Sequence, residues 1–398
     1  GMLHDEFFMK RVSGMKRRIR KKSKKLSLDG RTAEEQLERC RRELVDQIDG
    51  LARVVRKEIL PALAEEGLPI LDYDAVKESE KVHLRQYFRD SVKPILTPLA
   101  VDAEHPFPFI SNDALNLAVM VPVESNGHKR FVRIKVPDNR PRWVPVSSAG
   151  GFVPLEQVIA ANLDLVFPTA PPKQVHLFRV TRGAEGERDQ SAEFSEDELQ
   201  EPGSIVLQVS AELKARRFAG VVRLQVSADM PAEMVSWISR RLGIESEDVY
   251  PTDTFLGISD LLDLDTEGRD DLRLAWHEPV THPRLRQLPP RDPDAIFREI
   301  AKGDILVHHP YDSFDTSVLR FLESAAVDPG VLAIKLTIYR TSKRSPIVTA
   351  LAEAARRGKQ VAVLVEITAR FDEAPNIAWG QYLENEGVHV AYGVEKLK

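Results

Sequence analysis

Two arginines, Arg340 and Arg370, each follow an apolar run with the composition of a β-strand. Arg340 ends the run 331–339, and Arg370 comes shortly after residues 361–367, thirty residues further along the chain. That interval is about the length of one strand–helix–strand unit. Because the carboxyl ends of successive parallel strands meet at one crevice, we expect both side chains to face a common site. Two guanidinium groups there predict a site for a phosphate-rich anion, since each offers several fixed donors and keeps its charge.

The alternative for these two arginines is structural. Each could cap a helix or pair with a nearby acid such as Asp372 or Glu373. The shared position of the two arginines in successive units favours the anion site. The segment 341–344, Thr-Ser-Lys-Arg, adds hydroxyl and basic groups that such a site would also use.

The pair His308-His309 is a second candidate, for a metal ion. We predict a strand over residues 305–308, and neighbouring residues of a strand point to opposite faces. We therefore expect ordinary strand-end histidines and not two ligands of one ion. The sequence contains no Cys/His cluster, P-loop or G-x-G-x-x-G element, so any use of ATP would need other means.

The totals describe a globular chain of more than one domain. It has 398 residues, of which 42% are hydrophobic and 29% charged, and a formal net charge of −5. No apolar stretch reaches the roughly 18 residues that span a bilayer, and no secretory segment opens the chain. The single cysteine, Cys40, excludes an internal disulfide and is typical of a reducing cytoplasm. Residues 15–25 carry eight basic groups, which either contact a polyanion or face solvent.

The helix and strand patterns divide the chain into three predicted domains. Residues 1–96 show the apolar spacing of helices, with Thr32 as an N-cap. Residues 97–286 mix strands and helices without strict alternation, which is typical of an α+β domain with a mixed sheet. In 287–398 regular alternation predicts a buried parallel sheet, and the fold class is multidomain α/β. The strands of this last part are expected over 305–308, 331–339, 361–367 and 388–394, and its helices over 312–326, 347–357 and 377–386.

Several longer motifs are similar to those of the bacterial polyphosphate kinase family of the phosphohistidine, phospholipase-D-like type. In chain order they lie in residues 5–8 (DEFF), 96–99 (LTPL), 106–112 (PFPFISN), 178–182 (FRVTR), 303–314 (GDILVHHPYDSF), 333–340 (AIKLTIYR) and 369–379 (ARFDEAPNIAW). The resemblance runs through essentially the whole chain. It implies a truncated helical N-terminal domain, an α+β head domain and a truncated first phospholipase-D-like α/β domain.

The resemblance also implies an activity, which is reversible transfer of the γ-phosphate of ATP to inorganic polyphosphate through a phosphohistidine. The expected partners are ATP/ADP, polyphosphate and further copies of the chain, and the expected cofactor is Mg²⁺. Nucleic acid is not an expected partner. The expected location is cytoplasmic, with a peripheral position at the inner membrane face left open.

Within that resemblance, Arg340 and Arg370 match two arginines that the family assigns to its magnesium–phosphate site. Arginine has no lone pair to offer a cation. We therefore interpret both residues as clamps for phosphates that in turn hold the metal.

The match further predicts that the chain is a fragment without a catalytic residue. The family's nucleophile lies in Gly-Leu-Lys-x-His-x-Lys and would fall two residues beyond Lys398, with Lys396 in place of the glycine. The asparagine of the family's N-terminal nucleotide contact and the second phospholipase-D-like domain are also expected to be absent. Thr368 stands where the family often has lysine or glutamine, which puts a secondary polar contact in doubt. We expect these 398 residues to be inactive alone and still able to bind polyphosphate.

Two other functions fit part of the pattern. A phospholipase-D-like phosphodiesterase would share the histidine chemistry but would not need the head domain or the N-terminal helices. A non-catalytic polyanion-binding module could use residues 15–25 together with the two arginines. Salt-dependent polyphosphate binding that needs the arginines and not residues 15–25 would favour the kinase over the module.

Overall fold

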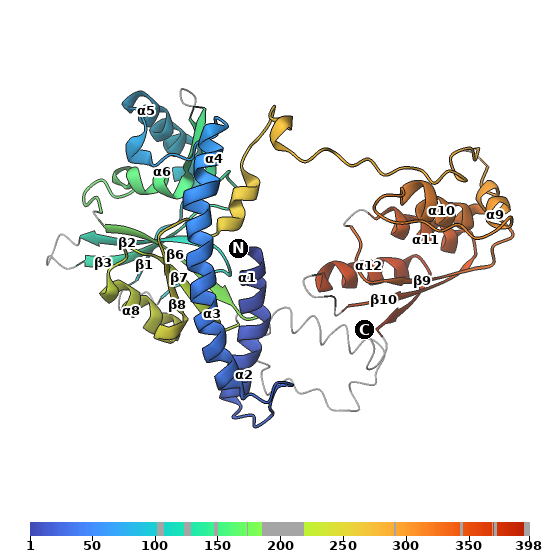
Figure 1. Ribbon diagram of the computed structural model, residues 1–398, viewed down its shortest axis with the longest axis horizontal. Coiled ribbons are helices and arrows are strands. Elements are labelled where there is room, and N and C mark those ends of the chain that lie inside the picture. Colours follow the sequence, from blue (N-terminus) through green and yellow to red (C-terminus); the bar gives the residue numbers. More distant parts are fainter. Residues whose placement is uncertain are drawn as a thin grey trace. The chain divides into compact units, whose positions relative to one another are not determined.

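A computed structural model gives the structure of the chain (Figure 1). It describes residues 1–101, 107–122, 129–146, 150–172, 174–184, 219–289, 292–342, 345–367, 369 and 372–393. These residues form two compact units: unit 1 contains the described residues up to 267, and unit 2 those from 268 onward. The three predicted domains are spread over two units, so the boundaries at 96/97 and 286/287 stay predictions. No helix among the described residues is long and apolar enough to cross a membrane.

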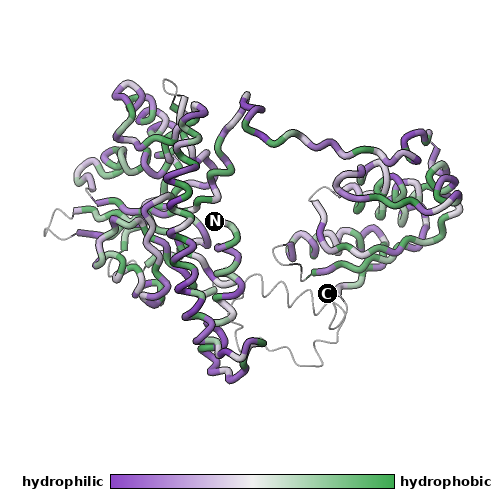
Figure 2. The backbone as a smooth tube through the Cα atoms, in the orientation of Figure 1, coloured by the Kyte–Doolittle hydropathy of each residue, from purple (hydrophilic) through white to green (hydrophobic). Residues whose placement is uncertain are grey.

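Unit 1 begins with two long helical segments that lie side by side (Figure 1). The first contains α1 (Met2–Phe7), η1 (Phe8–Val12) and α2 (Ser13–Arg20), and the second contains α3 (Ala33–Val54), η2 (Val55–Ile59) and α4 (Leu60–Glu65). The Thr32 hydroxyl accepts a hydrogen bond from the Glu35 amide at 3.2 Å, and the Glu35 carboxylate accepts one from the Thr32 amide at 2.8 Å. This capping box confirms Thr32 as the N-cap. Figure 2 shows hydrophobic and hydrophilic residues alternating along α3, as in an amphipathic helix.

The rest of unit 1 is a mixed sheet with short helices. The helices are η3 (Tyr73–Ala75), α5 (Glu78–Tyr87), η4 (Phe88–Val92), η5 (Lys93–Ile95), α6 (Leu155–Ala161), η6 (Leu163–Leu165), α8 (Ala232–Leu242), η9 (Ser246–Asp248) and η10 (Ile258–Asp263). The strands are β1 (Leu99–Val101), β2 (Leu115–Pro122), β3 (Lys129–Lys135), β4 (Trp143–Val146), β5 (Gly151–Pro154), β6 (Gln174–Arg182), β7 (Val221–Ser227) and β8 (Val249–Thr252). The main sheet has the order β1-β3-β2-β6-β7-β8, and only its β7–β8 pair is parallel. The predicted mixed sheet is therefore confirmed.

Strand β6 shows how the sheet uses its two faces. Successive side chains of a strand point to opposite faces. Phe178 and Val180 join the core that α8 covers. Arg179 and Thr181 lie on the other face, where Arg179 contacts Asp5 of the first helix.

A buried charge cluster joins that first helix to the sheet. Arg179 donates two hydrogen bonds to the Asp5 carboxylate, at 2.9 and 2.8 Å, and Arg223 of β7 pairs with the same carboxylate. Arg223 is 1% exposed, donates to the Thr181 hydroxyl at 3.0 Å and lies 4.4 Å from the centre of the Phe8 ring. Burial raises the pKa of Asp5, but the two arginines outweigh it, so this pKa lies below its ordinary value of 3.8.

Unit 2 contains a three-stranded parallel sheet. Its elements are η11 (Asp270–Leu272), α9 (Ala295–Ile300), η12 (Asp315–Leu319), α10 (Arg320–Val327), β9 (Ala333–Ile338), α11 (Pro346–Arg356), β10 (Gln360–Val365), α12 (Glu373–Asn385) and β11 (His389–Tyr392). The strand order is β11-β10-β9, and both pairs are parallel. This confirms the predicted alternation from residue 331 onward.

The predicted strand over 305–308 is wrong, because these residues do not adopt strand structure and pair with no strand among the described residues. A local turn binds this segment instead: the His308 amide donates to the Asp312 carboxylate at 2.7 Å. The ring nitrogen Nδ1 of His309 lies 2.8 Å from the Asp312 carbonyl oxygen. The two imidazoles lie against different rings, those of Tyr311 and Phe314.

The helices that connect the strands of unit 2 lie on one face of the sheet (Figure 1). The strands follow one another across the sheet in chain order, and right-handed crossovers in one direction place α11 and α12 on the same side. On the opposite side Ala333, Lys335 and Thr337 of β9 are exposed. The prediction of a buried sheet therefore holds for one face only.

We predict that Asp5→Ala lowers the free energy of unfolding of unit 1 by about 3–5 kcal/mol, because two buried arginines lose their shared counter-charge. Since the pKa of Asp5 is lowered in the folded chain, its contribution is complete above 3.8 and declines as the pH falls further. The gap between the wild type and the variant should therefore narrow in acid. Urea unfolding at several pH values, with limited proteolysis to identify the unit that opens, measures this. Asp46→Ala on α3 is the control, and an equal loss there would contradict the prediction.

Candidate functional site

The candidate site lies where β9 and β10 end. The two strands end level with one another, because Ile338 of β9 is paired with Val365 of β10. The Glu366 amide then donates to the Ile338 carbonyl oxygen at 2.9 Å, which extends the pairing by one residue. The segments that follow the two strands therefore leave the sheet side by side, as the sequence predicted for parallel strands.

Arg340 leaves this edge of the sheet and forms an ion pair with Asp372. Its Nε lies 2.8 Å from the Asp372 Oδ2 atom, and the two side chains are 54% and 38% exposed. Its guanidinium carbon lies 5.5 Å from the centre of the Tyr339 ring. Asp372 directly precedes α12, where the helix dipole stabilises a carboxylate. The pairing with Asp372 was the structural alternative left open by the sequence, and it is present at the surface of the unit.

The side chain of Asn376 links the ends of β9 and β10. It is 1% exposed, and its Nδ2 donates to the carbonyl oxygens of Tyr339 at 2.9 Å and Glu366 at 2.8 Å. Tyr339 directly follows β9, and Glu366 directly follows β10. The side-chain Oδ1 of Asn376 has no hydrogen-bond partner among the described residues. One amide on α12 thus sets the distance between the two segments, and it does so next to Arg340.

The segment after β9 contains a second polar contact, which lies at the start of α11. Ser345 is 3% exposed, stands directly before α11 and accepts a hydrogen bond from the Thr341 hydroxyl at 2.6 Å. Helices α11 and α12 therefore both begin at this edge. The amino-terminal ends of helices carry a partial positive charge that favours anions.

Only part of the predicted site lies in the described residues. Arg340 is placed, whereas Arg370 lies outside them, as do Lys343, Arg344 and Thr368. The predicted sharing of one pocket by Arg340 and Arg370 therefore stays a prediction. The end of the chain, including Lys396 and Lys398, is also outside the described residues.

Sequence reasoning did not identify Asn376 as a site residue and considered Asp372 only as a structural partner. Asn376 stands four residues after Asp372, and its backbone amide donates to the Asp372 carbonyl oxygen at 2.9 Å within the first turn of α12. A buried asparagine in the first turn of the helix that follows a parallel strand is a recognisable signal of such a link, because its amide can bind the carbonyl groups at the ends of the strands.

The described residues at this edge combine one guanidinium group with the starts of two helices. Among them, no group of three or more His, Cys, Asp or Glu residues could bind a metal ion. The Asp372 carboxylate is engaged by Arg340, and a guanidinium group has no lone pair to give a cation. The geometry supports charge neutralisation by Arg340 and the helix ends, and the described residues 339–342 and 372–376 contain no histidine or cysteine that could act as a nucleophile.

Comparison with known proteins assigns the chain domain by domain. The family model described as the polyphosphate kinase N-terminal domain matches residues 3–71, the middle domain matches 79–264, and C-terminal domain 1 matches 295–398. The polyphosphate kinase of Mycobacterium tuberculosis is 44% identical over 408 residues, which cover 99% of this chain and 54% of the relative. That of Mycobacterium marinum is 44% identical over 404 residues, covering 99% of this chain and 53% of the relative.

A solved structure agrees with these matches. The crystal structure of polyphosphate kinase from Porphyromonas gingivalis is similar to this chain with a TM-score of 0.77 and 25% sequence identity, over 100% of this chain and 54% of that one. The chain thus spans about half the length of the relatives it matches. Since three successive domain models of one family together match most of its residues, the chain belongs to the polyphosphate kinase family.

Proposed function

We propose that this chain serves the reversible transfer of the γ-phosphate of ATP to inorganic polyphosphate through a phosphohistidine. The observation that carries the proposal is the exposed ion pair of Arg340 with Asp372, at the edge where β9 and β10 end and α11 and α12 begin. In this proposal Arg340 holds polyphosphate, and Arg370 is a second clamp.

The Arg340–Asp372 pair suits a clamp that exchanges partners. Both side chains are more than a third exposed, and an exposed ion pair contributes only about 0–1 kcal/mol. A guanidinium–phosphate contact is charge-assisted and can be bidentate, so a polyphosphate oxygen can replace the Asp372 carboxylate. Asp372 then acts as a place-holder that orients Arg340 until the anion binds.

The chemical contribution of such a clamp is electrostatic. During phosphoryl transfer negative charge is spread over the oxygens of the moving group, and fixed cationic donors stabilise it. Asn376 contributes indirectly, because it holds the segment that carries Arg340 at a fixed height above the sheet. We assign Asn376 the role of a positioning residue.

Further parts of the proposal come from the family resemblance. ATP/ADP and polyphosphate are the substrates, and the protein works as a homo-oligomer. Mg²⁺ is the cofactor, and because arginine has no lone pair to give a cation, the phosphates that Arg340 and Arg370 hold would in turn hold the metal.

We predict that these 398 residues alone form no phosphohistidine, because the family's nucleophile matches none of their positions. Incubation with γ-labelled ATP and Mg²⁺, followed by a test for acid-labile protein-bound phosphate, measures this. A full-length relative is the positive control. Acid-labile phosphate on the 398-residue chain would contradict the prediction.

Arg340→Ala should weaken binding of long-chain polyphosphate about tenfold or more, because a charge-assisted contact contributes about 1.5–3 kcal/mol. Asp372→Asn should strengthen the binding several-fold, because the competing carboxylate is removed. Equilibrium binding at several salt concentrations measures both, and Arg340→Ala should also flatten the salt dependence. If the ion pair were purely structural, both variants would weaken binding equally, which would refute the clamp.

Asn376→Ala should reduce polyphosphate affinity more than its loss of stability explains, because the segment before Arg340 loses its anchor. The matched control is Gly380→Ala on the same helix, where a Cβ atom would lie 2.5 Å from the Tyr392 ring and overpack α12 against β11. Hydrogen exchange of unit 2 reports the stability of each variant, and calorimetry reports its affinity. Equal affinity losses at equal stability would leave Asn376 without a positioning role.

A further inference from the structure

The connection between α2 and α3 presents a run of unneutralised lysines. Lys21, Lys22, Lys24 and Lys25 are exposed, and none of these four side chains has an ion pair in the part of the chain that the structure describes. We call residues 21–28 the tip of the α2–α3 hairpin; in Figure 1 it lies at the end of unit 1 next to the α2 label. The positive charge of the four lysines therefore faces solvent or an anionic partner.

Two leucines share this tip with the lysines. Leu26 is 53% exposed and Leu28 is 110% exposed, so neither contributes to the core of unit 1. Single exposed leucines are ordinary, but two of them beside four lysines give the tip a mixed basic and apolar character. That combination is typical of segments that lie in the headgroup region of a membrane.

The tip has a defined conformation. Lys22 adopts a left-handed conformation with φ 49°, and the amides of Lys21 and Ser23 donate to carbonyl oxygens of α2 at 3.0 Å. On the other side, the Ser27 amide donates to the Arg31 carbonyl oxygen at 2.9 Å. Backbone hydrogen bonds therefore bind both ends of the segment, so the lysines and leucines are presented together.

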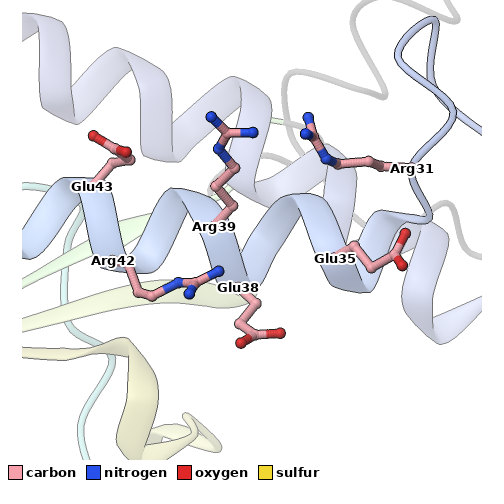
Figure 3. A pocket seen from close by; sticks show the side chains of 6 residues that line it. All are labelled: Arg31, Glu35, Glu38, Arg39, Arg42 and Glu43. Carbon is pink, nitrogen blue, oxygen red and sulfur yellow. The ribbon is translucent and has the colours of Figure 1, made fainter.

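The neighbouring surface of α3 is balanced in charge, which concentrates the positive potential at the tip. Figure 3 shows a hollow there that is lined by three arginines and three glutamates, namely Arg31, Arg39, Arg42, Glu35, Glu38 and Glu43. Opposite charges four residues apart, as in Glu35 and Arg39, offset one another along a helix. The hollow therefore has no net charge from these groups, and the four lysines dominate the field at this end.

We propose that the tip docks unit 1 onto an anionic lipid surface, with the four lysines at the phosphate groups and Leu26 and Leu28 in the headgroup region. The leucines decide between a membrane and a soluble polyanion. A linear polyanion would engage the lysines but would leave both leucines in water, whereas a lipid surface can use both kinds of group. The inference does not depend on the phosphate site of unit 2.

Binding of the chain to vesicles of equal parts phosphatidylglycerol and phosphatidylcholine tests the proposal, with pure phosphatidylcholine as the neutral reference. Two variants separate the contributions. Replacing the four lysines by serine should weaken the partition roughly several hundredfold, since each contributes about fivefold near an anionic surface. Leu26→Ser with Leu28→Ser should weaken it roughly tenfold and leave its salt dependence unchanged.

A matched control removes the same amount of charge elsewhere on unit 1. It carries serine in place of the exposed residues Arg53, Lys57, Lys77 and Lys93. This control should bind vesicles nearly as well as the wild type, because the positions lie outside the tip.

Three results would overturn the inference. The first is vesicle binding that survives loss of the four lysines, and the second is an equal loss in the control. The third is binding that depends on the lysines and not on Leu26 and Leu28, and that soluble polyphosphate of similar charge reproduces. That last outcome would assign the tip to a soluble polyanion.

Discussion

Unit 1 depends on a carboxylate that two arginines of its sheet share, while one of them, Arg179, also pairs with Asp113 at 3.1 Å. Arg179 and Arg223 are 5% and 1% exposed, and Asp5 bridges them from the first helix of the chain. A buried guanidinium group without a counter-charge is strongly destabilising, so the sheet and the helix require one another. The contact also fixes the direction of α2, which continues the helix that carries Asp5. The placement of the basic tip at the end of α2 thus follows from a charge interaction near its beginning.

Unit 2 uses a neutral group for a comparable purpose. Asn376 donates to the carbonyl oxygens of Tyr339 and Glu366, and it thereby links the segments after β9 and β10. An ionised aspartate could not do this at the same position, because its carboxylate would face two other acceptors. A buried, hydrogen-bonded amide thus supports a solvent-exposed ion pair, that of Arg340 with Asp372. A fixed backbone segment that carries an exchangeable ion pair suits the binding of a long, repetitive anion.

The sequence predicted the features that depend on local patterns. The strand–helix alternation after residue 331, the parallel pairing and Thr32 as N-cap all follow from periodicity and capping chemistry, and the structure has them. Arg340 was placed correctly at a strand end for the same reason. The failures concern partners that a local pattern does not contain. Residues 305–308 have the composition of a strand but pair with no strand in the part of the chain that the structure describes. The apolar runs also do not reveal that the described helices α11 and α12 lie on one face of the sheet. The pairing of Arg340 with Asp372 was one of the alternatives that the sequence left open, whereas the buried bridge of Asn376 depends on where α12 meets the sheet.

The face of the small sheet opposite α11 and α12 carries a charged side chain that disfavours the stacking of two copies. Lys335 of β9 lies in one row with Ala362 and His389 of the neighbouring strands. A second sheet laid flat on that row would enclose the Lys335 ammonium group away from water, which is unfavourable by several kcal/mol when no anion accompanies it. This face of the sheet can therefore be exposed to solvent without favouring self-association, because stacking of two copies would bury the Lys335 ammonium group.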